Sequence, residues 1–170
     1  MPKILDAPKE HIIAAAREEL LSEGVKGFNI RPVAKNSGVA IGTIYNYYGN
    51  KTSLIVAVIL DNWKQIKKEL DAKCHDVSKE EAVRLSYDAI AAFHEGNKQA
   101  ISEIFEVAPD CFSRGRDPED AMLADVKAIF VGELGVTPGR ATLAAKALFL
   151  GVSEEEVTEE EAKAVALATL

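Results

Sequence analysis

The sequence has few of the features that mark a membrane-spanning or a secreted protein. Its longest apolar run, Leu54 to Leu60, has seven residues, whereas a membrane-spanning helix needs about 20, and its first residues lack the apolar core of a signal peptide. The only two cysteines, Cys74 and Cys111, are too few for the disulfide framework of a small secreted domain and stand in no zinc-binding spacing. We therefore expect a cytoplasmic protein with no metal, no cofactor and no membrane partner.

The motifs of common enzyme classes are missing as well. The sequence contains no GxSxG, no HExxH, no phosphate-binding loop and no Gly-rich dinucleotide motif. The three histidines, His11, His75 and His94, fall on three different predicted elements, and no convergent set of polar groups is recognisable in the sequence. We expect no enzymatic activity.

Acidic side chains are absent from one long stretch of the chain. The net charge is −7, but Gly24 to Leu60 contains no Asp or Glu and four cations, Lys26, Arg31, Lys35 and Lys51. Because Lys and Arg side chains drive binding to phosphates, a local cationic surface matters more here than the net charge. The alternative is that the acid-free stretch is simply a half-buried segment.

The periodicity of the apolar residues predicts an all-α protein. No segment shows the alternation of a strand, and apolar residues instead recur three or four positions apart between capping residues. The first helix is expected from Lys9 to Glu23, with Gly24 ending it in the left-handed conformation. Two short helices, over 30–37 and 41–47, and a longer one that starts after Asn50 are expected next.

Capping signals predict the later helices. Ser78 with Glu81 indicates a helix to about Glu95 that Gly96 closes, and Asn97 is expected to cap a further helix that Pro109 ends. Two further helices are expected to begin at Asp117-Pro118 and at Thr137-Pro138 and to end at Gly135 and Gly151. A capping box of Thr158 and Glu161 is expected to begin the last helix.

Residues 30 to 48 have the pattern of a helix-turn-helix motif. Val33 and Ala34 are expected on the inner face of the first short helix, and Ile44 on that of the second. Two helices that cross closely need a small residue at the contact and a turn residue that tolerates φ > 0, which Ala34 and Gly38 provide. Such helix pairs also occur in unrelated bundles, so the outer face of the second helix decides the interpretation.

That outer face carries polar and aromatic side chains and no acid. Three of the four tyrosines lie between positions 45 and 48; Tyr48, four residues after Ile44, is expected on the inner face, whereas Tyr45 and Tyr47 cannot both share it. A helix inserted in the major groove presents its first residues to the bases while flanking donors hold phosphates. The alternative here is a buried tyrosine cluster.

One run of residues, from about His11 to Val58, follows a family signature at its usual spacings. The matching segments are Ile12 to Ala16, Gly24, Phe28, Val33-Ala34, Ser37-Gly38-Val39, Gly42 to Tyr48, Lys51 and Leu54. In these residues the chain resembles the N-terminal DNA-binding domain of the TetR family of transcriptional regulators. The resemblance implies a helix-turn-helix domain over residues 1–53, with the motif at about 28–47, and a helical ligand-binding and dimerisation domain over 54–170.

The same resemblance implies the function. The protein would be a ligand-responsive regulator, a repressor that binds a palindromic DNA operator as a homodimer and is released by a small-molecule effector. Because Ala40 and Ile41 are apolar, contacts with thymine methyl groups are expected there. The expected DNA-binding residues are Arg31, Ala40, Ile41, Gly42, Thr43, Tyr45, Asn46, Tyr47 and Lys51.

Two further sets of residues are expected in the second domain. Large or adaptable side chains that could line an effector pocket, or simply form the core, are Trp63, Tyr87, Phe93, His94, Phe105, Phe112 and Met122. Residues that could form the dimer interface, or the core within one chain, are Leu143, Ala144, Ala147, Leu148, Ala162, Val165, Ala166 and Leu170. Cys74 and Cys111 could sense oxidants, although a buried inert thiol is the commoner case.

A second class of function stays open at this point. The chain could be a helical small-molecule-binding or interaction protein without DNA binding. Such a protein would be expected to have a disrupted recognition face, and the acid-free segment from Ile41 to Lys51 argues against that.

Overall fold

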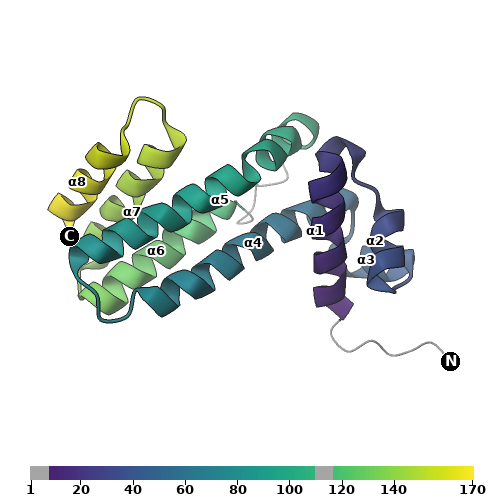
Figure 1. Ribbon diagram of the computed structural model, residues 1–170, viewed down its shortest axis with the longest axis horizontal. Coiled ribbons are helices and arrows are strands. Elements are labelled where there is room, and N and C mark those ends of the chain that lie inside the picture. Colours follow the sequence, from purple (N-terminus) through teal and green to yellow (C-terminus); the bar gives the residue numbers. More distant parts are fainter. Residues whose placement is uncertain (1–7, 110–116) are drawn as a thin grey trace. The chain divides into compact units, whose positions relative to one another are not determined.

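Helices make up all the regular structure in the described part of the chain. The computed structural model describes residues 8–109 and 117–170 and confirms the all-α prediction (Figure 1). The helices are α1 (Pro8–Gly27), α2 (Ile30–Ser37), α3 (Ile41–Tyr48), α4 (Lys51–Lys73), α5 (Lys79–Val107), α6 (Pro118–Leu134), α7 (Pro138–Ser153) and α8 (Glu159–Thr169). Of the helices described, none is long and apolar enough to cross a membrane.

Most predicted helix ends are confirmed by their caps. The Asn29 side chain accepts a hydrogen bond from the Arg31 amide (3.0 Å) at the start of α2, and Gly38 ends that helix at φ 71°. Asp117 caps α6 in the same way, and Thr158 and Glu161 form the complete capping box of α8. These ends depend on neighbouring residues alone, which is why local sequence signals find them.

The expected break at Gly96 and Asn97 is wrong, because α5 continues from Lys79 to Val107. The Asn97 side chain, which we expected to cap a new helix, donates instead to the Phe93 carbonyl one turn earlier (2.8 Å). Its amide is thereby satisfied inside the helix, which has no reason to end there. Gly151 likewise does not terminate α7, which continues to Ser153.

Gly24 interrupts α1 rather than ending it. The residue has the predicted positive φ (65°), but with ψ −178°, and the helix resumes over Val25 to Gly27. This conformation is accessible essentially to glycine alone. The direction of the chain therefore changes at Gly24, six residues before α2 begins at Ile30.

The chain forms two compact units. Unit 1 consists of Met1–Asp61 and Gln99–Cys111, and unit 2 of Asn62–Lys98 and Phe112–Leu170. The expected division after residue 53 therefore differs from the observed units in two respects. The first part of α4, up to Asp61, and the end of α5 belong with the N-terminal helices, because these two long helices each contribute residues to both units.

The core of unit 2 is built around Trp63 of α4. Its ring meets the Phe93 ring edge to face at 5.9 Å, and its indole N–H donates to Asp125 Oδ2 (2.8 Å). Helices α6, α7 and α8 pack in sequence order, α7 directly against α8 (Figure 1). The aromatic pair and the satisfied indole fix α4, α5 and α6 against one another.

Candidate nucleic-acid interface

Helices α2 and α3 cross as the helix-turn-helix prediction requires. Val33, Ala34 and Ile44 are buried at their contact, and the Val39 amide in the turn donates to the Ala34 carbonyl (3.2 Å). Gly38 takes the left-handed conformation that the turn needs. Both helices are thus held on their inner faces, which leaves the outer face of α3 to the solvent.

The outer face of α3 is exposed and free of acidic residues. Ile41, Tyr45 and Tyr47 keep 41%, 45% and 42% of their surface accessible, and Gly42 and Asn46 are exposed beside them while Thr43 is half-buried. Tyr48 is half-buried on the inner side, and burial raises the pKa of its hydroxyl. The buried tyrosine cluster that we considered is therefore not formed.

The start of α3 leaves backbone donors available. Ala40 precedes the helix and makes no side-chain cap, and its carbonyl accepts from the Thr43 amide (2.9 Å). The amides of Ile41 and Gly42 remain in the first turn, where an anion is favoured. A Cβ atom added at Gly42 would meet nothing within 4 Å, so the surface there can be approached closely.

The neighbouring helices α1 and α2 carry cations. Arg31 and Lys35 of α2 are exposed, and neither makes an ion pair with any described residue. The Lys9 ammonium of α1 lies 5.3 Å from the centre of the Tyr47 ring, a cation–π contact that sequence analysis missed because the two residues are far apart in the chain. Lys26 differs, since it pairs with Glu106 (3.1 Å).

Lys51 has a structural contact in addition to any contact with DNA. Its ammonium donates to the Phe28 carbonyl (3.0 Å), which ties the start of α4 to the end of the α1 segment. Asn50 caps α4 by accepting from the Ser53 amide (2.8 Å). A lysine ammonium has three donors, so this bond leaves two for other acceptors.

The expected pocket residues do not form one group. Trp63, Tyr87, Phe93 and Met122 are buried in unit 2, and His94 is half-buried there. Tyr87 donates its hydroxyl to the Gly151 carbonyl (3.0 Å) and has Lys163 over its ring. Phe105 is exposed and belongs to unit 1, and Phe112 lies outside the described residues.

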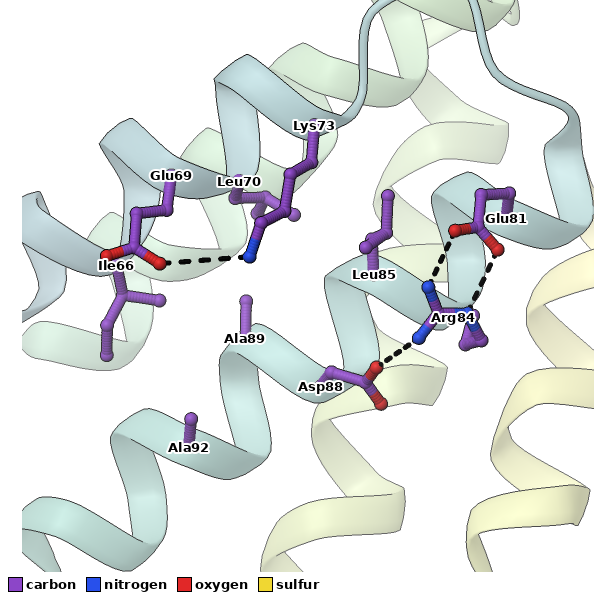
Figure 2. Close-up of a pocket in the computed structure, with 10 residues that line it drawn as sticks. All are labelled: Ile66, Glu69, Leu70, Lys73, Glu81, Arg84, Leu85, Asp88, Ala89 and Ala92. Carbon is purple, nitrogen blue, oxygen red and sulfur yellow. Dashed lines mark hydrogen bonds and ion pairs between the residues drawn. The ribbon is translucent and has the colours of Figure 1, made fainter.

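An open groove in unit 2 runs between α4 and α5 (Figure 2). It has a volume of about 550 Å³, and none of the expected pocket residues lines it. Its floor is apolar, with Leu70 and Leu85 facing each other across it. Its rim carries paired charges: Glu69 with Lys73 (3.8 Å), and Arg84 with Glu81 (2.6 Å) and Asp88 (2.7 Å).

The expected dimer residues divide into buried and exposed sets. Leu143 and Val165 keep 62% and 55% of their surface accessible. Leu150, which lies two helical turns after Leu143 on the same face of α7, is also exposed. The other six lie in the core of unit 2 within one chain, where α7 and α8 pack together: Ala144, Ala147, Leu148, Ala162, Ala166 and Leu170. Only the exposed set is available to another chain as the structure stands.

Among the described residues we find neither a reactive thiol nor a cluster of metal-binding side chains. Burial raises the pKa of the Cys74 thiol to about 11, so it is protonated at neutral pH and a poor nucleophile; Cys111 lies outside the described residues. In the described ranges, no group of three or more His, Cys, Asp or Glu side chains is placed to hold a metal ion.

Comparisons with known proteins agree with this geometry. Residues 12–58 match the family model described as bacterial regulatory proteins, tetR family, and so cover the helix-turn-helix of unit 1. No curated protein sequence shows significant similarity to the chain.

Solved structures share the fold over almost the whole chain. The multidrug binding protein EbrR, solved with ethidium, is 18% identical with a TM-score of 0.61, over 96% of this chain and 98% of that one. A TetR transcriptional regulator from Rhodococcus sp. RHA1 is 20% identical with a TM-score of 0.60, over 96% and 93%. The transcriptional regulator FadR from Bacillus subtilis, solved with stearoyl-CoA, is 19% identical with a TM-score of 0.51, over 95% of each chain.

The signature residues, the helix-turn-helix that they build and the match over residues 12–58 point the same way. Over residues 12–58 the chain is similar to the bacterial regulatory proteins of the tetR family.

Proposed function

We propose that the protein is a transcriptional repressor that binds a palindromic DNA operator through α3 and is released by a small-molecule effector. The observation that carries the proposal is the outer face of α3, which is exposed, contains no acidic residue and has the Lys9 ammonium over Tyr47, while the neighbouring helix α2 carries the exposed cations Arg31 and Lys35. In the major groove, Gly42 and Thr43 near the start of α3 would meet base edges. Arg31, Tyr45, Tyr47 and Lys51 would hold phosphates beside them.

The salt dependence of DNA binding tests the role of Arg31. We expect Arg31→Ala to lower the magnitude of the slope of log affinity against log salt by about 0.9, because one fewer phosphate is neutralised. The measurement is fluorescence anisotropy with a duplex selected from a random-sequence pool. Lys64→Ala is the matched control, since Lys64 is an exposed cation of α4 in unit 2. An Arg31→Ala slope equal to that of the control would show that α2 does not lie along the backbone.

Gly42→Ala separates DNA contact from folding. A methyl group at Gly42 meets open space in the protein, so the helical preference of Ala should raise the free energy of unfolding by about 0.5–1 kcal/mol. Affinity for the selected duplex should nevertheless fall about 10-fold, an order-of-magnitude cost for moving a closely apposed surface away. Urea denaturation and anisotropy measure the two quantities. A more stable variant with unchanged affinity would place Gly42 outside the interface.

A two-fold symmetric operator requires two copies of α3. We propose that a second copy of the chain supplies the other one and that the exposed apolar residues of α7 and α8, Leu143, Leu150 and Val165, lie at the contact between copies. Exposed apolar side chains on neighbouring helices favour association with another surface.

The effector response is proposed for unit 2. It is supported by the fold shared with EbrR, solved with ethidium, and FadR, solved with stearoyl-CoA. An effector that binds one state of the protein better would shift it away from the operator-bound state. If no hydrophobic compound in a panel that includes ethidium and stearoyl-CoA releases the selected duplex, this part of the proposal is wrong.

A further inference from the structure

The interruption of α1 at Gly24 is closed by a side chain from the far end of α5. The Val25 amide, which opens the helical turn after Gly24, donates to Glu103 Oε2 (3.1 Å). Both carboxylate oxygens of Glu103 lie within 4 Å of the position that a Cβ of Gly24 would occupy (3.6 and 3.9 Å). Glu103 therefore acts as the cap of a helical turn that has no capping residue of its own.

Glu103 is itself held in position. The Gln99 side-chain amide, one turn earlier in α5, donates to Glu103 Oε1 (2.9 Å). These contacts, together with the amides of Val25 and Lys26, lower the pKa of the Glu103 carboxyl, so it is ionised at neutral pH. Ile104 beside it is buried, and the end of α5 is thereby anchored in unit 1.

The capped turn leads directly into the corner before α2. The Phe28 amide donates back to the Gly24 carbonyl (3.0 Å), and the Lys51 ammonium donates to the Phe28 carbonyl (3.0 Å). The Asn29 amide donates to Glu19 Oε1 (3.1 Å), while the Asn29 side chain caps α2. The directions of α2 and α3 relative to α1 thus depend on the short segment from Gly24 to Asn29, which these hydrogen bonds hold.

We propose that Glu103 is a positioning residue for DNA recognition: by capping the turn at Val25 it fixes the corner between α1 and α2 and so the direction of α3. The inference rests on the proposed function. It assigns a role in recognition to a residue of α5 that lies 78 positions from the amide it binds and does not itself touch DNA.

Amide exchange and binding specificity, measured on the full-length protein, test this role. In Glu103→Ala the Val25 amide should exchange about 10-fold faster, because it loses its acceptor. Affinity for the selected duplex should fall about 10-fold relative to a scrambled duplex of the same length, since a misdirected α3 loses base contacts before it loses phosphate contacts. In Glu103→Gln, the amide oxygen can still accept one bond, and both effects should be smaller.

Glu106→Gln is the matched control. It removes one negative charge from the same helical turn region and breaks only the exposed pair with Lys26, so it should leave both readouts at the wild-type level. A merely structural role of Glu103 would lower the melting temperature while the ratio of specific to scrambled affinity stayed the same.

Three outcomes would overturn the inference. They are unchanged exchange at Val25 in Glu103→Ala, faster exchange with an unchanged affinity ratio, and an equal loss of the ratio in Glu106→Gln. If wild-type protein does not distinguish the two duplexes, the proposed function fails first, and the exchange at Val25 still reports whether Glu103 holds the corner.

Discussion

A chain carrying both Leu143→Glu and Val165→Glu is expected to be monomeric and to bind its selected duplex about 10²–10⁴-fold more weakly than the wild type. Both side chains are exposed on helices that pack against each other. Burying two carboxylates at a contact between copies would be unfavourable. A monomer would engage one half-site at a time, which removes the gain from simultaneous binding.

Helices α7 and α8 place the two positions close to one another. Arg140, at the start of α7, donates to the Thr169 carbonyl at the end of α8 (2.6 Å), so the helices run antiparallel and Leu143 and Val165 lie at similar levels. Surface changes are preferable to deleting α8, because Ala162 and Ala166 are buried and their removal would uncover the core.

Sedimentation equilibrium gives the mass, and anisotropy gives the affinity. Ala128→Glu, at an exposed position of α6 in the same unit, is the control for added negative charge and should leave the mass and the affinity unchanged. A double variant that remains dimeric with wild-type affinity would exclude this face as the contact between copies.

The second large effect is expected from Gly151→Ala, which should lower the free energy of unfolding by about 1–3 kcal/mol. A Cβ atom on Gly151 would stand 2.3 Å from the Ala162 Cβ and 3.3 Å from Tyr87 Cε2. Such a separation forces α8 away from α7, and it also disturbs the bond that the Tyr87 hydroxyl donates to the Gly151 carbonyl (3.0 Å). Each kcal/mol should lower the melting temperature by about 2–4 °C in a chain of this size.

Two further variants make the Gly151 result specific. Gly132→Ala places the same methyl group on α6, where nothing lies within 4 Å, and should stabilise the protein by about 0.5–1 kcal/mol. Adding Ala162→Gly to Gly151→Ala removes the Ala162 Cβ atom, with which the new methyl group clashes. The double variant should therefore lose less stability than the sum of the two single changes. Strict additivity would contradict close packing of α7 against α8.

The parts of the fold that could be predicted from the sequence are the helix ends formed by hydrogen bonds between residues close in the chain. Asn29, Gly38 and the Thr158–Glu161 box cap their helices through bonds that span at most five residues. The prediction failed at Asn97, because the same amide that can cap a helix can also bond to the preceding turn, and here it is buried in doing so. Which of these two bonds forms depends on tertiary packing, which a short stretch of sequence does not reveal.

The candidate interface divides in the same way. The spacing of Ile44 and the tyrosines placed the exposed face of α3 correctly, because helical period alone determines it. Contacts between distant residues could not be predicted: Lys9 with Tyr47, Lys51 with the Phe28 carbonyl, and Glu103 with the Val25 amide. Similarly, the apolar pattern of α7 and α8 could not separate the residues that pack within one chain from Leu143 and Val165, which remain exposed.

The central claim is that α3 reads DNA bases from two copies of the chain at once, and selection from a random-sequence duplex pool tests it most directly. The account predicts enrichment of a two-fold symmetric sequence whose half-site centres lie about 10 base pairs apart, or a multiple of that. It also predicts that Thr43→Val changes the enriched bases within each half-site. A pool that shows no enrichment, or asymmetric sites that Thr43→Val leaves unaltered, would contradict the account.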